Sequence, residues 1–597
     1  MEYFLAEFNF EKRTIDEFSL SECNSLSLPG GLFGWKSSSP FVTIQRLTDW
    51  TVFLWGSPQC RTKATTSQEL AYEIAVNLVQ DNSLQSDLMK LEGFFAVIAW
   101  NEKDSQLLFA TDPVGMTKVY YGENQGRIVI SSHAQHVARR LGDFTVSPQG
   151  LSILFSLKGI LAPYTVFQAV SVLKPAEILT ITGDGRKSDN YWSPLDRITA
   201  FKGSLEDAQD ELQTLLVNSL QRIPTVSSEP IGVSMSSGVD SALIAALLVQ
   251  AGVAAEGLTV GYEPPTRFDE TQGALENAQQ IGLPMDVLRV TDKDITNVLD
   301  FSTKSFPEPL GDATILPQLL MTLAGRGKIT SIIDGTGADN IFGGMQKFTA
   351  ERYAQRYLKI PRVLRVNLIK PALGLFPSSR KSTFTDQMRK LQKFSYGVEL
   401  PEQLQKVYWS RFMSKEAVER IISATLLPDG HLADQILLEI RDEVPHGFDD
   451  FYTSTYASIR GTLPTHATQK LVTLQYASGI LYHTPFLTPG LIEFALSLPA
   501  SYKLSAGETK VVLRRTASSI LPIECTKRRK ATFSPPIGRW LTGVFNTEFK
   551  DLLKNNSFFN TEEIEKMLRD QSSGWRDWQW ELWLVFIFLK WFREASR

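Results

Sequence analysis

Residues 231–241, IGVSMSSGVDS, lead from a short apolar stretch into a Ser/Gly-rich turn that ends in Asp240 and Ser241. The following residues, 242–249, are apolar and helix-prone. A strand that turns through small residues into a helix leaves backbone N–H groups at the helix start unpaired, and such groups bind anions. Asp240 is acidic where a phosphate would lie, which requires a divalent cation between them. The fragment therefore predicts a nucleotide-phosphate loop.

A second fragment, residues 331–344 with the sequence SIIDGTGADNIFGG, has the same design. It combines an apolar strand, a small-residue turn and an aspartate, Asp339. Parallel strands end at one edge of a sheet, where a crevice binds ligands. Either fragment alone could be an ordinary Ser/Gly turn between a strand and a helix. Together they predict that Asp240 and Asp339 hold one Mg²⁺ against the triphosphate of ATP.

The overall composition narrows the class of protein. A chain of 597 residues with 43% hydrophobic and 21% charged residues is typical of a globular protein with more than one domain. A net charge of −4 does not favour a general nucleic-acid partner, and the three cysteines favour neither a disulfide framework nor a Cys-rich zinc site. The first residues lack a signal-peptide pattern, and the apolar run 582–589 is far shorter than a membrane span. We therefore expect a cytoplasmic protein with no membrane partner.

The secondary-structure patterns divide the chain near residues 196–203. Residues 1–200 contain short β-branched and aromatic runs broken by Gly, Asn and Asp, with a helical pattern at 67–80. These runs predict two packed sheets with helices outside, an α/β/β/α sandwich, including a hairpin that turns at Asp184-Gly185. Residues 201–597 begin with an amphipathic helix and then alternate strands with helices, which predicts a doubly wound parallel sheet. The fold class is α/β in both parts.

A basic segment, residues 351–396, contains eleven Lys/Arg against two Asp/Glu and is interrupted by Pro361, Pro371 and Pro377. One interpretation is a solvated helical face or a mobile loop. The other is a docking surface for an acidic or peptide substrate. The sequence leaves both open.

With both halves in view, the chain resembles the asparagine synthetase superfamily over most of its length. The resembling segments are GFFAVIAWNEKDSQLLFATDPVGMTKVYY (93–121), TVFQAV and YWSP (within 165–194), SSGVDS, LTVGY, EPLGDA (308–313), DGTGADNIFGG, HTPFLTPGLIEFALSLP (483–499), ETKVVLRR (508–515) and KRRKATFSPPIGRWL (527–541). The resemblance implies an Ntn-hydrolase-like glutamine amidotransferase domain at 1–200. It also implies an ATP-binding synthetase domain at 201–597, with an adenine nucleotide α-hydrolase-like fold.

Roles for individual residues follow from this resemblance. Val260 is expected to contact adenine, with Asp334 and Gly335 on the other side of the nucleotide. Asp240 and Asp339 are the implied Mg²⁺ ligands, and Lys530 is the implied catalytic lysine near the developing negative charge. The residues expected to line the ATP phosphate loop are Ser234, Ser236, Ser237, Gly238, Asp240 and Ser241.

Several positions depart from the family pattern. Glutamine-hydrolysing members carry a cysteine nucleophile directly after the initiator Met, whereas this chain has Glu2 there and its nearest cysteine is Cys23. Ser237 replaces a glycine of the phosphate loop, and Asn340 replaces an acidic residue after Asp339. Thr336 stands where ammonia-using synthetases have Glu and β-lactam-forming relatives have Tyr, so no general base is assigned. We expect the first domain to lack glutaminase activity.

The chemistry that fits is ATP-dependent amide-bond formation through an acyl-adenylate, with release of pyrophosphate and AMP. Without a glutaminase the amine must come from elsewhere, for example from the molecule that also carries the carboxylate, as in the related β-lactam synthetases and lasso peptide cyclases. The long stretch of 191 residues from Asp339 to Lys530, the basic segment and the missing nucleophile favour lasso-type cyclisation of a precursor peptide. Such an enzyme could need a leader-peptide-binding protein and a leader protease as partners. The alternatives are asparagine synthesis from free ammonia, a β-lactam synthetase-like cyclase of small molecules, and a non-enzymatic nucleotide-binding protein.

Overall fold

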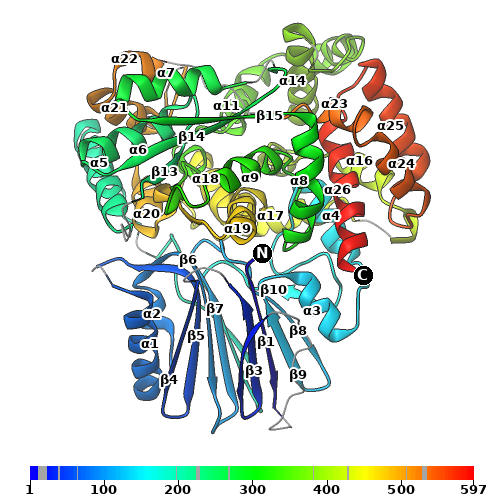
Figure 1. Ribbon diagram of the computed structural model, residues 1–597. Coiled ribbons are helices and arrows are strands. Elements are labelled where there is room, and N and C mark those ends of the chain that lie inside the picture. The colour runs from blue at the N-terminus through cyan, green and yellow to red at the C-terminus, as the bar shows by residue number, and fades with distance from the viewer. Residues whose placement is uncertain are drawn as a thin grey trace.

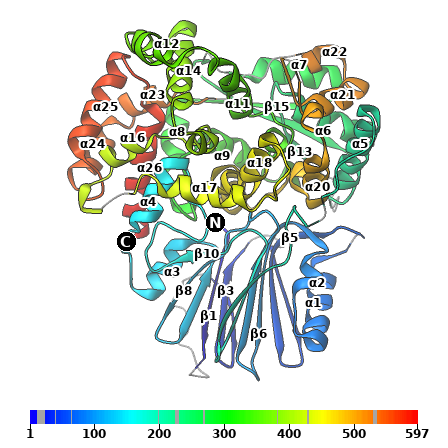
Figure 2. The same cartoon turned by 180° about the vertical axis from the view of Figure 1, so that it is seen from behind.

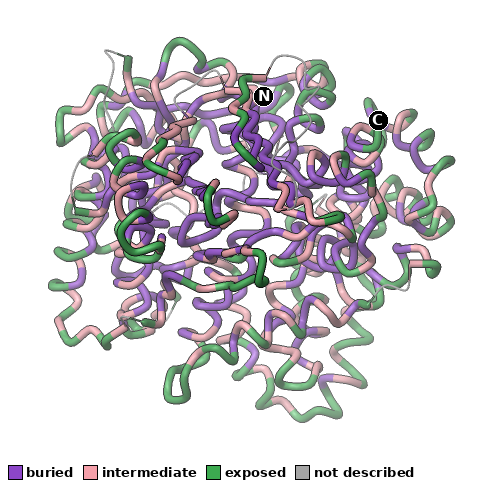
Figure 3. The backbone as a smooth tube through the Cα atoms, turned by 90° about the horizontal axis from the view of Figure 1, so that it is seen from below, coloured by how far each residue is buried: buried purple, intermediate pink, exposed green. Residues whose placement is uncertain are grey.

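The computed structural model describes residues 1–10, 23–37, 41–62, 65–196, 198–223, 229–266, 269–380, 382–426, 429–505, 507–527 and 534–597. The chain forms an N-terminal part of two antiparallel sheets, with a parallel sheet and many helices beyond it (Figures 1 and 2). Seen from below, much of the interior of the chain is buried, and exposed segments lie both around the edge and in loops that face the viewer (Figure 3).

The N-terminal part is built from two six-stranded antiparallel sheets. The first has the order β10-β8-β9-β1-β3-β2 and the second the order β12-β11-β7-β6-β5-β4. The strands of the first are β1 (Tyr3–Asn9), β2 (Asn24–Leu28), β3 (Gly31–Lys36), β8 (Tyr120–Asn124), β9 (Arg127–Ser131) and β10 (Ser171–Val172). Those of the second are β4 (Val42–Leu47), β5 (Trp50–Cys60), β6 (Leu91–Asn101), β7 (Gln106–Thr111), β11 (Glu177–Thr182) and β12 (Gly185–Asn190).

Helices cover both outer faces of this sandwich. The helices of this part are α1 (Ser67–Asp81), α2 (Gln85–Leu88), α3 (Ala134–Leu141) and α4 (Pro148–Leu157). Helix α1 packs on β4 and β5, and α3 packs on β8 and β9. Strand β6 is buried along nearly its whole length because both of its faces are covered. The predicted sandwich with outer helices is confirmed.

The predicted hairpin is present, but its turn lies one residue earlier than expected. Thr182 pairs with Gly185, so Gly183 and Asp184 form the turn and Gly185 already belongs to β12. Gly185 has φ 139°, a backbone conformation that favours glycine.

The second part contains a five-stranded parallel sheet with the order β15-β14-β13-β16-β17. Its strands are β13 (Ile231–Ser234), β14 (Ala255–Tyr262), β15 (Met285–Val290), β16 (Ser331–Ile333) and β17 (Leu481–His483). Helix α5 (Leu205–Gln221) precedes the sheet, and the helices that follow its strands include α6 (Val239–Gln250), α7 (Thr271–Ile281), α8 (Asp292–Ser305), α9 (Ile315–Ala324) and α10 (Ala338–Ile341). The predicted parallel sheet is confirmed, and the chain order reverses between β13 and β16, where such sheets bind ligands.

A long helical excursion separates β16 from β17. Its elements are α11 (Gln346–Tyr357), α12 (Arg362–Leu364), the π-helix η1 (Arg365–Ile369), α13 (Lys370–Gly374), α14 (Thr383–Val398), α15 (Glu402–Tyr408), α16 (Lys415–Ile421), η2 (Ala424–Leu426), α17 (Leu432–Asp442), α18 (Asp450–Ala457), η3 (Ser458–Ala467) and α19 (Thr468–Ser478). The basic segment 351–396 is therefore mostly helical despite its three prolines, which supports the helical-face interpretation rather than a loop.

The chain ends in helices and a small hairpin. These elements are η4 (Pro485–Leu487), α20 (Pro489–Ser497), η5 (Ala500–Tyr502), β18 (Leu504–Ser505), β19 (Glu508–Thr509), α21 (Val511–Ile520), α22 (Ile523–Lys527), α23 (Ile537–Thr542), α24 (Asn546–Lys554), α25 (Thr561–Ser573) and α26 (Gln579–Ala595). The apolar run 582–589 lies in α26 and is almost entirely buried. No helix among the described residues is long and apolar enough to cross a membrane.

Candidate active site

Two carboxylates meet at the carboxyl edge of the parallel sheet, joined by a lysine. Asp240 lies in the first turn of α6, directly after β13, and Asp339 lies in α10, after β16. Lys510 Nζ donates to both carboxylate oxygens of Asp240, at 2.8 and 2.6 Å, and lies 2.7 Å from Asp339 Oδ1. The Lys510 side chain is only 4% exposed. The structure thus brings together the two aspartates that the sequence pairs, and adds a cation between them.

Glycines permit this close approach. A Cβ built on Gly344 would collide with both Asp339 Oδ1 and Lys510 Cε. On the other side of the site, a Cβ on Gly335 would lie 3.5 Å from Asp240 Cβ and 3.8 Å from the Ser241 backbone nitrogen. Gly335 therefore faces the start of α6. The Gly343-Gly344 pair after α10 has a steric role that the sequence alone does not reveal.

The predicted phosphate loop is held by bonds within itself. Ser236 Oγ accepts from the Gly238 backbone N–H at 3.1 Å and lies 3.0 Å from Ser241 Oγ. Ser241 Oγ accepts from the Ser236 backbone N–H at 3.1 Å. Ser234, the last residue of β13, leads into this loop. The turn is preorganised, with the N-terminus of the twelve-residue helix α6 at its end.

Glu270, an acidic residue that the sequence reasoning missed, touches this loop. Its Oε2 accepts from Ser237 Oγ at 3.1 Å and lies 3.4 Å from the Ser237 backbone nitrogen. Both residues are buried. Ser237, which replaces a glycine of the family pattern, thus uses its hydroxyl to bind Glu270. Glu270 directly precedes α7, and no pattern in the sequence marks its contact with the loop.

The predicted adenine wall is apolar and buried. Val260 is 6% exposed in β14, between β13 and β15. Asp334 follows β16, and its Oδ1 accepts from the Thr336 backbone N–H at 2.8 Å and from the Thr336 hydroxyl at 2.5 Å. Thr336 therefore closes the turn that carries Gly335. Its hydroxyl is occupied by Asp334, so Thr336 is no substitute for the missing general base.

The predicted catalytic residue, Lys530, lies outside the described residues, which resume at Ser534. The lysine that the structure places at the two aspartates is Lys510. It belongs to ETKVVLRR, a segment quoted above for its resemblance without a role for its lysine. Lys510 has φ 57°, a left-handed backbone conformation uncommon outside glycine, which places it just before α21. Only the spatial meeting with Asp240 and Asp339 distinguishes it from an ordinary basic residue at a helix start.

The donor set at this site fits a magnesium ion shared with phosphates. Carboxylate oxygens are preferred Mg²⁺ ligands, and Mg²⁺ is commonly bound by one or two carboxylates with phosphate oxygens completing its shell. Asp240 and Asp339 supply two such carboxylates, and Lys510 cancels only one of their two charges. Among the described residues there is no group of three or more His, Cys, Asp or Glu that could hold a metal alone. A metal here would therefore depend on phosphate oxygens.

Glu2 lies directly before β1, at the position where the family pattern has the glutaminase nucleophile. This residue is 3% exposed, and its backbone N–H donates to the Tyr476 carbonyl of α19 at 2.8 Å. The Tyr476 hydroxyl in turn accepts from Trp55 Nε1 at 3.1 Å. Cys23, the nearest cysteine in sequence, lies with its Sγ 2.7 Å from the Tyr3 hydroxyl. A buried carboxylate residue thus occupies the position, packed against the synthetase part.

A second contact between the two parts, at Glu308, includes buried groups whose pKa values are shifted. Glu308 accepts from the Val166 backbone N–H at 2.9 Å and from the Tyr120 hydroxyl at 3.1 Å, and both partners belong to the N-terminal part. Burial raises the pKa of Glu308 to about 7. Burial also lowers the pKa of Lys118, whose charge acts on Glu308, to about 8. The segment 308–313, with the sequence EPLGDA, therefore connects the N-terminal part to the synthetase part through Glu308, and it also contains Asp312.

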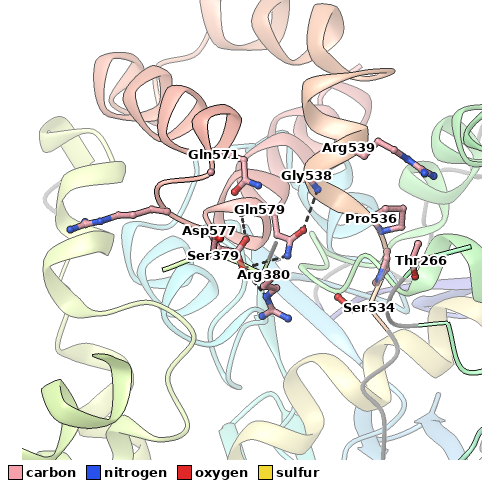
Figure 4. A pocket seen from close by; sticks show the side chains of 13 residues that line it. Thr266, Ser379, Arg380, Ser534, Pro536, Gly538, Arg539, Gln571, Asp577 and Gln579 are labelled. Atoms are coloured by element: carbon pink, nitrogen blue, oxygen red, sulfur yellow. Dashed lines mark hydrogen bonds and ion pairs between the residues drawn. The ribbon is translucent and has the colours of Figure 1, made fainter. Parts of the chain in front are cut away.

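A pocket of about 230 Å³ opens between the loop after β14 and the C-terminal helices (Figure 4). In this pocket Arg380 Nε donates to Asp577 Oδ2 at 2.7 Å, and Gln579 Oε1 accepts from the Gly538 backbone N–H at 3.2 Å. Its wall includes Ser534, the first described residue after the Lys530 segment.

Further charges lie beside this pocket, where both parts contribute. Lys158, directly after α4, stacks 3.9 Å from the ring of Trp580, and burial lowers its pKa to about 8. Burial raises the pKa of Glu581 to about 7. Asp312 lies 3.5 Å from Lys470. The charge of Arg380, in the pocket wall, acts on both Lys158 and Glu581.

This combination of folds and residues defines an ATP-dependent ligase with an amidotransferase-like N-terminal part. The chain belongs to the asparagine synthase family: the family's sequence profile matches residues 211–593, and that of a glutamine amidotransferase domain matches residues 62–192.

Several curated proteins are similar to most of this chain at low sequence identity. "Asparagine synthetase [glutamine-hydrolyzing] 1" of Bacillus subtilis is 22% identical over 513 residues, which cover 84% of this chain and 77% of that protein. "Amidase chry2" of Gibberella zeae is 19% identical over 547 residues, covering 85% and 77%. Among solved structures, glutamine phosphoribosylpyrophosphate amidotransferase from Bacillus subtilis aligns with a TM-score of 0.21 at 12% identity, over 48% of this chain and 59% of that one. The fold assignment therefore rests on the strand orders above.

Proposed function

We propose that this ligase joins a carboxylate and an amine of the same peptide, closing a lasso-type macrolactam through an acyl-adenylate. The observation that carries the proposal is a contrast within the chain. Asp240, Asp339 and Lys510 assemble a charged site at the α6 N-terminus, whereas Glu2 stands where a glutaminase needs its cysteine. An ATP site without a glutaminase nucleophile calls for an amine from another source.

In the proposed reaction a carboxylate oxygen of the substrate attacks the α-phosphorus of ATP. The bond to the β-phosphate oxygen breaks, and pyrophosphate leaves with the bonding electron pair. The substrate amine then attacks the acyl carbon, AMP leaves, and the amine loses a proton. The product is the substrate minus one water.

The residues of this chain mainly position groups and neutralise charge. The phosphate loop, with Ser234, Ser236, Ser237, Gly238 and Ser241, would bind phosphate oxygens at the α6 N-terminus, and Val260, Asp334 and Gly335 would hold the nucleoside. Asp240 and Asp339 would hold Mg²⁺, which supplies neutralisation of the triphosphate when bound. Lys510, now between the two aspartates, would move toward the phosphates once a dication takes over its partners. Lys530 would face the acyl-phosphate.

The pocket lined by Arg380, Asp577 and Gln579 is the candidate cleft for the rest of the substrate. It combines cationic, anionic and amide groups, which suits a peptide better than a single small acid. Lys158 brings a residue of the N-terminal part to its side. The retained N-terminal domain would thus contribute to substrate binding rather than to glutamine hydrolysis. A leader-peptide-binding protein and a leader protease are proposed partners for delivering such a substrate.

A second candidate is amidation of a small amino acid by free ammonia, favoured by the asparagine synthetase relatives. Thr336 counts against it, because its hydroxyl is bonded to Asp334 and it replaces the glutamate expected in ammonia-using enzymes.

The deciding experiment supplies the protein with ATP, Mg²⁺ and either short peptides encoded beside its gene or L-aspartate with ammonium chloride. The proposal predicts AMP, pyrophosphate and a peptide product lighter by one water. Asparagine formation without peptide turnover would contradict it. Asp240→Ala should abolish turnover, whereas Asp286→Ala, at the exposed side chain of a β15 residue paired with Lys328, is the matched control and should not.

A further inference from the structure

The helical excursion between α11 and α14 exposes an unusual amount of apolar surface. Nine of the sixteen large apolar side chains that are exposed among the described residues lie between residues 353 and 391. We call these nine side chains the cap surface: Tyr353, Leu358, Val363, Leu364, Leu368, Leu375, Phe376, Phe384 and Leu391. Soluble proteins rarely gather so many apolar side chains in one exposed region, and such gatherings mark interaction sites.

The short helix formed by α12, η1 and α13 buries a charged side chain and exposes apolar ones, the reverse of what is usual for a helix in a folded protein. Its Arg365 is buried, donating to the Ile360 carbonyl at 2.8 Å and pairing with Glu399. Val363 and Leu368 are 68% and 63% exposed, and Leu375, directly after α13, is 78% exposed. A helix that folds its arginine inward and its leucines outward presents the apolar side for binding.

The exposed charged side chains around the cap surface are all basic. The exposed basic residues in this region are Arg356, Lys359, Arg362, Lys370 and Lys390. The described residues 352–393 contain one acid, Asp386, and it is only 13% exposed and pairs with Arg389 at 2.8 Å and Lys390 at 3.0 Å. A complementary partner must therefore be both anionic and apolar, although the whole chain has a net charge of −4.

The cap surface also projects outward. Helices α12 and α14 lie at the end of the molecule farthest from the N-terminal sheets (Figure 2). Three of its side chains are more than 60% exposed, so they stand out from the backbone rather than line a groove. A groove would suit a peptide, whereas projecting leucines ringed by lysine and arginine suit insertion among lipid headgroups.

We infer that the cap surface docks this enzyme onto an anionic lipid surface, with its leucines among the acyl chains and its cations on the headgroups. This departs from the expectation of no membrane partner, which rested on overall composition and on the absence of a spanning segment. The contact is peripheral, since no described helix could cross a bilayer. The segment continues directly into Ser379 and Arg380 of the pocket, so docking would hold the candidate cleft close to the membrane.

Vesicle flotation of the full-length protein tests this inference. The wild type should float with phosphatidylcholine vesicles that contain phosphatidylglycerol, and not with phosphatidylcholine alone, and added salt should weaken the binding. The double variant Leu368→Glu/Leu375→Glu should bind these vesicles at least about tenfold more weakly than the wild type. The matched control is Tyr72→Glu/Val79→Glu, at two exposed apolar residues of α1, which should bind as the wild type does.

Pyrophosphate release by the double variant should match the wild type in the absence of vesicles, which separates this test from that of the proposed function. Equal flotation of wild type and double variant would overturn the inference, as would failure of the wild type to float. A wild type that does not float but forms a dimer by light scattering, lost in the double variant, would assign the surface to a second copy instead. Binding only of an acidic peptide probe, again lost in the variant, would assign it to a protein partner.

Discussion

The carboxyl edge of the parallel sheet and the start of β1 are the two places where this family performs chemistry, and here they differ. At the sheet edge, Asp240, Asp339 and Lys510 converge from three distant segments, and Gly344 leaves the room for them to meet. At the start of β1, Glu2 is buried with its backbone bonded to Tyr476. The sandwich fold around the second place is complete, with Glu2 at the position where the family pattern has a cysteine.

This difference teaches that the N-terminal part has a structural role toward the synthetase part, apart from any reaction of its own. The N-terminal part supplies Tyr120 and the Val166 backbone to Glu308, and Lys158 to the side of the pocket. These contacts support the synthetase part whatever stands at position 2. If the chemistry lies only at the sheet edge, substitutions there should have the largest effects.

The largest effect is expected from removing the charges at the sheet edge. Asp339→Ala or Lys510→Ala should lower the rate of pyrophosphate release at least about a thousandfold, because neutralisation of the leaving phosphate is lost. Radiometric pyrophosphate release measures it. A rate within tenfold of the wild type for either variant would place the ATP site elsewhere.

A smaller but severe loss is expected at the predicted catalytic lysine. Lys530→Ala should lower turnover by roughly a hundredfold, with ATP binding largely retained, because this cation acts on the transition state rather than on the bound nucleotide. Calorimetric titration of ATP alongside turnover separates the two. Unchanged turnover would show that Lys530 is not the catalytic lysine, and Lys527→Ala serves as the neighbouring control.

Gly344→Ala should weaken the site without removing any charged group. Its new Cβ would displace Asp339 and Lys510, and a displacement of this kind costs about tenfold to a hundredfold in turnover. Gly490→Ala is the matched control, since a Cβ there meets no neighbour within 4 Å. Equal turnover of both variants would mean that the tight packing around Lys510 does not matter.

Glu308→Gln should change how stability depends on pH. Because burial raises the pKa of Glu308 to about 7, its contribution to stability is complete below the ordinary value of 4.5 and is lost as pH rises through about 7. Relative to the variant, the wild type should therefore lose up to about 3 kcal/mol of unfolding free energy over that window. Thermal unfolding across the window measures it. Glu402→Gln, at a side chain that is 84% exposed, should show no such shift.

The smallest effect is expected at the start of β1. Glu2→Cys should create no measurable release of glutamate from glutamine, because restoring a thiol does not rebuild a glutamine pocket. Glutamine hydrolysis by this variant at the rate of a glutaminase would contradict this expectation. It would show that the N-terminal part lacks only the nucleophile and still has a glutamine pocket.

Sequence periodicity predicted much of the fold. The helix expected at 67–80 is α1 (Ser67–Asp81), and the amphipathic helix after residue 203 is α5, with Ser204 capping its first turn. Strand β17 was not predicted, because three residues carry no periodic signal and its place in the sheet depends on partners far away in the chain.

The site was predicted in part. Asp240 and Asp339 each follow a strand with a small-residue turn, so their meeting follows from the topology of a parallel sheet. Lys510 and Glu270 could not be assigned, because each looks like an ordinary charged residue at the start of a helix. Their roles depend on distances that only the folded chain defines. The buried charges Lys158 and Glu581 were missed for the same reason.

Identification of the products of ATP turnover tests the central claim most directly. With a peptide substrate whose carboxylate oxygens are labelled with ¹⁸O, the account predicts AMP that carries one labelled oxygen, together with unlabelled pyrophosphate. Release of ADP and phosphate, or of AMP without the label, would contradict it.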